Sequence, residues 1–253
     1  MSGHSKWHSI KHQKGVADAR RGQLFTKLAR EITIAVREGG ANSDINFRLR
    51  LSIQKARDSN MPMENIERAI KRGSGELAGV TLAEVIMEGY GPGGAAILVQ
   101  ALTDNRNRTV QDIRNIFLRG GGSLGESGCV GWLFDSKGVI AVDAGNTDPE
   151  ELALQAIDAG AEDVKVEDGY IEIFTSPEEL EKVRAALEEK DTTISTAEIA
   201  MIPKTSLELE EKVALQTLKL LHKLEELDEV QSVCSNVDFP DSVLKEYAEQ
   251  AQG

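Results

Sequence analysis

The order of elements between residues 139 and 201 constrains the fold of this 253-residue chain more than any other feature. The pattern predicts strand, helix, strand, strand, helix, strand, which is the split βαβ or ferredoxin-like arrangement. Asp168-Gly169 has the composition of a two-residue hairpin turn between the second and third strands. The strands are expected at 139–143, 163–167, 170–175 and 194–201, the last of which ends before Pro203. One helix follows Asp148-Pro149, and the other begins at Ser176-Pro177 and runs to about Glu189.

Charge is divided unevenly along the chain, although the net value is only −13. Residues 1–75 contain 15 Lys/Arg and 7 Asp/Glu, whereas residues 76–253 contain 14 Lys/Arg and 35 Asp/Glu. The ferredoxin-like segment, 135–205, has 6 Lys/Arg and 18 Asp/Glu and is therefore a poor candidate for phosphate contacts. This asymmetry indicates one polyanion-binding end on an otherwise acidic molecule.

The basic end surrounds a tryptophan, Trp7, with cations that suit a phosphate backbone. Lysine and arginine gain from phosphate contact through counterion release, and an exposed tryptophan can stack on a base. A solvated basic tail is the competing interpretation. The predicted nucleic-acid contacts in this region are Lys6, Trp7, Lys11, His12, Lys14, Arg20, Arg21, Lys27 and Arg30. His4, His8 and His12 recur every four residues, but no carboxylate or cysteine completes a metal site, so no metal is predicted.

Three helices are predicted in the N-terminal domain, residues 1–78. Leu24, Leu28, Ile32 and Val36 recur every four residues, and Gly39-Gly40 ends that helix. Residues 45–53 alternate like a strand, but a lone strand between two helices would have no partner, so we favour a helix. Pro62 begins the third helix, and Gly73 lies past its end. The domain is expected to be a small helical bundle with a basic tail.

A discontinuous α+β middle domain is predicted from residues 79–134 and 206–240, with the acidic module of 135–205 inserted into it. Gly91-Pro92-Gly93 joins two apolar strands, and Asp104 or Asn105 caps the helix that follows. A second candidate contact is Thr103–Thr109, where Arg106 and Arg108 stand at a helix start; cap chemistry and local ion pairs are the alternative. The remaining elements are a glycine-rich loop at 120–125, a strand at 129–134, a boundary turn at Ser136-Lys137-Gly138, a helix at 207–227 and a strand at 230–237.

Two segments match motifs of catalytic or cofactor sites, but the secondary structure predicted around each is not the one that the motif requires. Residues 121–125 match G-x-S-x-G, but a helix precedes the serine and a strand follows it, which is the reverse of a hydrolase elbow. Residues 91–96 match G-x-G-x-x-A, but a strand follows where a dinucleotide site needs a helix. Cys129 and Cys234 form no pair motif, which is typical of a reducing compartment. We therefore predict a cytoplasmic, non-catalytic protein without a cofactor, and no membrane segment or secretion signal.

Several long stretches of the sequence resemble the YebC/PmpR family. They are GHSKW at 3–7, IKH at 10–12, RG, FTKL and REI across 21–32, NFRLRLSIQKARDSNMP at 46–62 and TDNRNRT at 103–109. The resemblance implies a three-domain fold, helical at the N-terminus and α/β in the other two domains. Bacterial members are described as transcriptional regulators that bind DNA, mitochondrial relatives activate translation of cytochrome oxidase, and some bacterial members resemble ribosome-associated factors.

Two classes of function follow from the sequence. The first is a nucleic-acid-binding regulator of gene expression, acting on DNA or on ribosomal or messenger RNA. In the second, the ferredoxin-like module binds a small ligand and the basic tail is incidental. The chain has no helix-turn-helix signal with a polar recognition face and no RNP-type aromatics, so nothing in it selects between DNA and RNA. The sequence does not indicate an oligomeric state.

Overall fold

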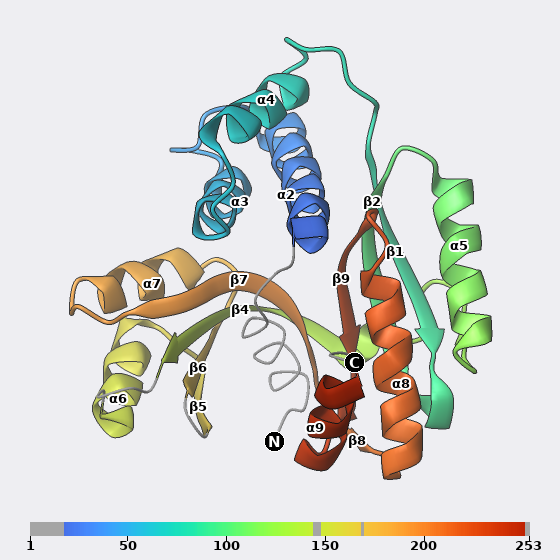
Figure 1. The fold of residues 1–253 in the computed structure, drawn as a ribbon. Coiled ribbons are helices and arrows are strands. Elements are labelled where there is room, and N and C mark those ends of the chain that lie inside the picture. The colour runs from blue at the N-terminus through green and yellow to red at the C-terminus, as the bar shows by residue number, and fades with distance from the viewer. Residues whose placement is uncertain (1–17, 144–147, 168–169, 251–253) are drawn as a thin grey trace. The chain divides into compact units, whose positions relative to one another are not determined.

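The computed structural model describes residues 18–143, 148–167 and 170–250 of the chain (Figure 1). It divides into two compact units, one formed by Met1–Phe134 with Pro203–Gly253 and the other by Asp135–Ile202. The fold is α+β, with an N-terminal helical region, a middle sheet and an inserted ferredoxin-like module, as the sequence predicts. No helix among the described residues combines the length and apolar character needed to cross a membrane.

The N-terminal region is a bundle of three helices, α2 (Asp18–Gly39), α3 (Phe47–Asp58) and α4 (Met63–Gly73). The strand-like alternation at 45–53 is therefore a helix, as favoured above. Asn46 explains why: its side chain accepts a hydrogen bond from the Leu49 N–H, capping α3, and donates to the Ala35 carbonyl. Ile45, which alternation would bury, is 80% exposed.

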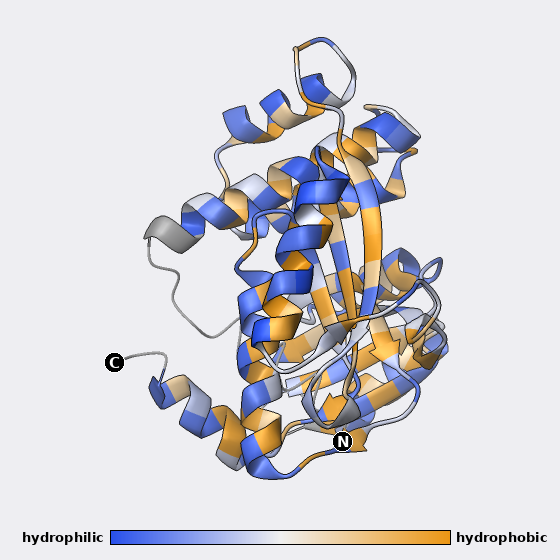
Figure 2. Cartoon of the chain, turned by 90° about the vertical axis from the view of Figure 1, so that its right-hand side faces the viewer, coloured by the Kyte–Doolittle hydropathy of each residue, from blue (hydrophilic) through white to orange (hydrophobic). Residues whose placement is uncertain are grey.

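The middle sheet has the strand order β3-β1-β2-β9. The main strands pair antiparallel, β1 (Ala83–Tyr90) with β2 (Ala96–Thr103) and β2 with β9 (Val230–Ser235). Helices α5 (Arg106–Arg119) and α8 (Glu211–Glu225) pack on one face of the sheet through a mainly aliphatic core that includes Val85, Ile97, Val99, Ile113, Phe117, Leu218 and Leu221. Along the helices, hydrophobic and hydrophilic residues alternate as amphipathic packing requires (Figure 2).

The fourth strand of this sheet differs from the prediction. The two-residue strand β3 (Ser123–Leu124), inside the glycine-rich loop, pairs with Gly89 and Tyr90 at the end of β1. The predicted strand at 129–134 is wrong, because residues 131–133 form a short 3-10 helix, η2 (Gly131–Leu133). A second short 3-10 helix, η1 (Pro92–Gly94), makes the turn between β1 and β2.

The predicted boundary turn at Ser136-Lys137-Gly138 is also wrong, since β4 (Phe134–Asp143) runs straight through it. Gly138 pairs with Thr175 in the neighbouring strand, and a Cβ at Gly138 would lie 2.2 Å from the Thr175 hydroxyl oxygen. The glycine is therefore needed for a close approach within a strand, a use that a sequence pattern does not distinguish from a turn.

The inserted unit is ferredoxin-like, with the sheet order β5-β6-β4-β7. The hairpin β5–β6 is antiparallel, and so is the pairing of β4 with β6. Its remaining elements are α6 (Pro149–Ala159), β5 (Asp163–Glu167), β6 (Tyr170–Thr175), α7 (Leu180–Glu188) and β7 (Ile194–Pro203). Its core is aliphatic and includes Ile140, Leu152, Ile171, Ile173, Val183 and Leu187.

The chain ends with elements that the sequence reading did not include. A short parallel pair joins β8 (Leu207–Glu208) to β10 (Val237–Asp238), and helix α9 (Asp241–Gln250) follows. α9 adds Val243, Leu244 and Tyr247 to the core of the middle sheet. The predicted end of the middle domain at residue 240 thus excludes a helix that packs on its core.

Candidate nucleic-acid interface

Most of the predicted basic tail has no described position. Lys6, Trp7, Lys11, His12 and Lys14 lie outside the described residues, as do His4 and His8. Arg20 belongs to α2, but its side chain is also outside the description. Within the described part of the chain, no group of three or more His, Cys, Asp or Glu side chains is arranged to hold a metal ion.

Two of the predicted α2 cations contact the middle domain. The Lys27 ammonium donates to the Glu225 carbonyl at 2.6 Å, and the Arg30 guanidinium donates to the Leu102 carbonyl at 3.4 Å. Arg37, two turns further along, donates to the Leu82 carbonyl. These residues form one stripe of α2, so they hold the bundle on the sheet, while the predicted contact Arg21 is exposed.

Arg108 and Arg30 share one carboxylate. Glu229 Oε1 lies 3.2 Å from an Arg108 guanidinium nitrogen and 3.7 Å from one of Arg30. Arg108 also pairs with Asp104 at 2.9 Å. Asn105 caps α5 by accepting from the Arg108 N–H, as predicted. The alternative given in the sequence analysis, a helix cap with local ion pairs, is therefore present at Arg108.

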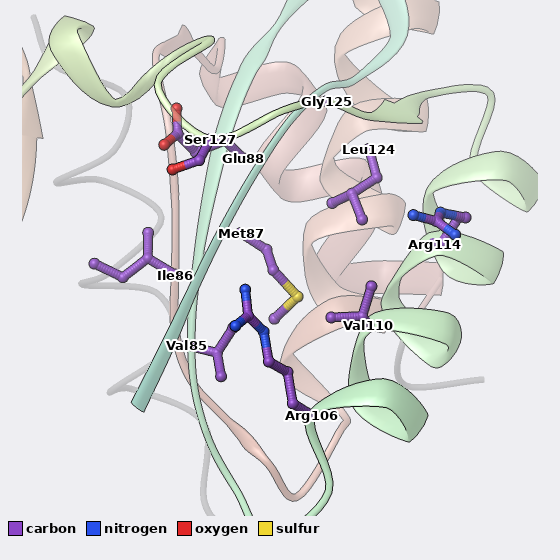
Figure 3. A pocket seen from close by; sticks show the side chains of 10 residues that line it. All are labelled: Val85, Ile86, Met87, Glu88, Arg106, Val110, Arg114, Leu124, Gly125 and Ser127. Carbon is purple, nitrogen blue, oxygen red and sulfur yellow. The ribbon is translucent and has the colours of Figure 1, made fainter. Parts of the chain in front are cut away.

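Arg106 is placed differently. Together with Arg114, two turns along α5, it lines a pocket of about 160 Å³ at the outer edge of β1 (Figure 3). Both arginines are exposed, and neither forms an ion pair with another residue that the structure describes. The other side chains at the pocket are Val85, Ile86, Met87, Glu88, Val110, Leu124 and Ser127, with Gly125 between them.

Glu88 is the only carboxylate of that pocket lining, and its oxygens accept hydrogen bonds from backbone donors. It is buried and accepts hydrogen bonds from the N–H groups of Gly128, Val130 and Gly131, at 2.7, 2.7 and 2.6 Å. Burial by itself would raise the pKa of this carboxyl, but the three donors outweigh burial and lower the pKa. Glu88 thus fixes the 125–131 loop against β1.

The family comparisons cover nearly the whole chain. The model described as "TACO1/YebC protein N-terminal domain" matches residues 5–76, and "TACO1/YebC second and third domain" matches residues 82–237. The chain belongs to the TACO1/YebC family. The resemblance seen in the sequence motifs is therefore confirmed.

Relatives in this TACO1/YebC family are similar over their full length. A "Probable transcriptional regulatory protein" from Dehalococcoides mccartyi is 59% identical, covering 99% of this chain and 100% of its own. One of the same description from Herpetosiphon aurantiacus is 55% identical over the same shares. A crystal structure of a conserved hypothetical protein from Aquifex aeolicus is 50% identical with a TM-score of 0.84, covering 92% of this chain and 96% of that one. The names of the Dehalococcoides and Herpetosiphon relatives describe regulators.

Two aromatic residues lie beside the 125–131 loop of this family member. Neither of them was identified from the sequence. Trp132 is 66% exposed and Tyr90 is 41% exposed, although both are large aromatic residues. The sequence offered one indication of a role for Trp132, namely that aromatic residues make up only 4% of the chain. Its exposure, and its proximity to Tyr90, became visible only in the tertiary structure.

Proposed function

We propose that this YebC-family protein is a non-catalytic, nucleic-acid-binding regulator of gene expression that binds DNA through its basic N-terminal region. The observation that carries this proposal is the charge division, 15 Lys/Arg against 7 Asp/Glu in residues 1–75 of a molecule with net charge −13. Positive charge that favours phosphate contacts is then concentrated at one end of an otherwise acidic chain. The names of the relatives support the regulatory role.

Only some of the lysines and arginines in residues 1–75 form ion pairs within the molecule. Arg48 and Arg68 pair with carboxylates within unit 1, whereas Arg57, Lys71 and Arg72 are exposed and form no ion pair with any residue in the described part of the chain. We propose Lys6, Trp7, Lys11, His12, Lys14, Arg20 and Arg21 as primary contacts. Arg21, Lys27, Arg30 and Arg108 have intramolecular interactions and would have to exchange them on binding.

Deleting residues 1–21 tests this proposal. If six cations meet phosphates, the affinity of the full chain for duplex DNA should fall about a thousandfold between 50 and 200 mM salt. The truncated chain should bind more weakly and with a shallower salt dependence, as measured by fluorescence anisotropy with a labelled duplex. A truncated chain that binds as tightly as the full chain would contradict the proposal.

A matched set of substitutions separates specific contacts from net charge. Lys6→Ala, Lys11→Ala and Lys14→Ala together remove three positive charges from the tail, and Lys182→Ala, Lys190→Ala and Lys219→Ala remove three exposed ones elsewhere. The first set should reduce the affinity much more than the second. Crosslinking in cells, followed by sequencing of bound DNA and bound RNA, decides between promoter DNA and a ribosome- or RNA-associated role.

A further inference from the structure

Two exposed aromatic side chains converge on a single backbone carbonyl. The Cys129 oxygen accepts a hydrogen bond from the Tyr90 hydroxyl at 3.0 Å and from the Trp132 indole N–H at 3.2 Å. The polar atom of each side chain is therefore satisfied, while much of each ring remains open to solvent. Such rings present flat apolar surfaces in fixed orientations.

The backbone that supports this pair is held on both sides. Besides the three donors to the Glu88 carboxylate, the Gly125 N–H donates to the Glu88 carbonyl at 2.8 Å. The Leu133 N–H donates to the Val130 carbonyl, closing the turn that carries Trp132. Because the loop is fixed before any ligand arrives, little conformational entropy remains to be lost on binding.

Positive charge lies beside the same strand, on α5, which packs against the face of β1 opposite to the two rings. Tyr90, Glu88 and Ile86 alternate on one face of β1, over roughly 13 Å, and Ile86 is 53% exposed. Arg106 and Arg114 line a pocket at the outer edge of β1 that Ile86 and Glu88 also border (Figure 3). The backbone positions of the two arginines are about 12 Å apart along α5. The Glu88 carboxylate uses its oxygens to accept from backbone donors and forms no ion pair with either arginine. Glu126 is the exposed acid of the loop.

We propose that Tyr90 and Trp132 form a stacking platform for unpaired bases of single-stranded nucleic acid, and that the strand passes over the outer edge of β1 so that its phosphates contact Arg106 and Arg114. Aromatic stacking needs an open base face, which single strands offer and a duplex covers with its neighbouring pairs. The site is separate from the basic tail and rests on the proposed function, because it specifies which form of nucleic acid the middle domain binds.

The chain provides its own reporter for this site. It contains two tryptophans, Trp7 and Trp132, so Trp7→Phe leaves Trp132 as the sole indole. We expect a 12-nucleotide mixed-sequence single strand to quench Trp132 fluorescence saturably in the full-length Trp7→Phe protein. The matching duplex should quench Trp132 fluorescence much less when the same fraction of the protein is bound. The bound fraction is measured independently from the fluorescence anisotropy of a labelled nucleic acid.

Substitutions test the same site by affinity. Trp132→Ala should weaken single-strand binding about 5- to 150-fold, the loss typical of one base stacked on an aromatic ring, and Trp132→Phe should recover most of it. Duplex binding should change little in either variant. Leu154→Ala, which removes another exposed apolar side chain, is the matched control and should leave both unchanged. Thermal unfolding verifies that each variant is folded.

The outcomes separate this proposal from the function on which it rests. Quenching by single-stranded RNA, single-stranded DNA or both supports the platform, and a preference between them reports recognition of the sugar. Single-strand binding without quenching, unchanged affinity in Trp132→Ala, or equal quenching by the duplex would overturn the platform and leave the proposed function intact. Absence of binding to every nucleic acid tested would reject the proposed function itself.

Discussion

At the scale of single residues, Glu88 has an unusual concentration of hydrogen bonds for a carboxylate. Three backbone N–H groups of the 128–131 segment point at its two oxygens within 2.7 Å. Bonds to a charged acceptor are stronger than neutral ones, and each donor would lack a partner if the carboxylate were lost. Glu88 is therefore a structural residue, because the conformation of the 125–131 loop beside Trp132 depends on its carboxylate.

Glu88→Gln should lower the free energy of unfolding by about 1–3 kcal/mol at pH 7, because an amide presents one acceptor oxygen and an N–H₂ group to three donors. Its folded-state pKa is below the ordinary value of 4.5, so the contribution of the carboxylate is complete above that pH and is lost as the pH falls through the lower folded value. Urea unfolding should show the two proteins converging in acid. An equal difference at neutral and acid pH would contradict this role.

At the scale of elements, close helix packing in the bundle depends on a glycine. Gly73 ends α4 against α2, and a Cβ there would lie 2.6 Å from the Val36 Cβ and 2.7 Å from the Thr33 carbonyl oxygen. A backbone oxygen cannot move aside without shifting the helix. The two helices therefore approach each other more closely than any larger residue allows.

Gly73→Ala should destabilise the protein by about 1–3 kcal/mol through overpacking. Gly22→Ala is the matched control, since Gly22 lies within α2 and a Cβ there would meet nothing within 4 Å. The control should stabilise the helix by roughly 0.5–1 kcal/mol, because alanine is the better helix former. Thermal unfolding of both variants measures the difference, and changes of the same sign would refute the packing argument.

At the scale of the whole molecule, the acidic module is an insertion whose ends meet. Its first and last strands, β4 and β7, are neighbours in one sheet, and the Lys204 N–H donates to the Leu133 carbonyl at 2.8 Å just outside it. Residues 135–202 contain 5 Lys/Arg and 18 Asp/Glu, so this segment accounts for the whole net charge of −13. The module is thus the main source of repulsion toward a polyanion.

Replacing residues 135–202 with a short Gly/Ser linker should bring the net charge to zero. We expect nucleic-acid affinity to rise roughly tenfold at 50 mM salt, with a smaller gain at higher salt as screening shortens the range of the repulsion. Anisotropy titrations across salt concentrations measure this, and circular dichroism confirms that the remaining unit is folded. An unchanged or lower affinity at low salt would indicate that the module contributes contacts of its own.

The sequence by itself determined the helical bundle, the ferredoxin-like order and the cap at Asn105, because periodicity and turn chemistry are local and each element carries its own signal. Only the tertiary structure decided that Arg30 and Arg108 meet at Glu229 and that Tyr90 and Trp132 share one carbonyl. Those contacts join residues distant in the chain. Which of them meet depends on how the sheet and helices pack, a property that no local pattern encodes.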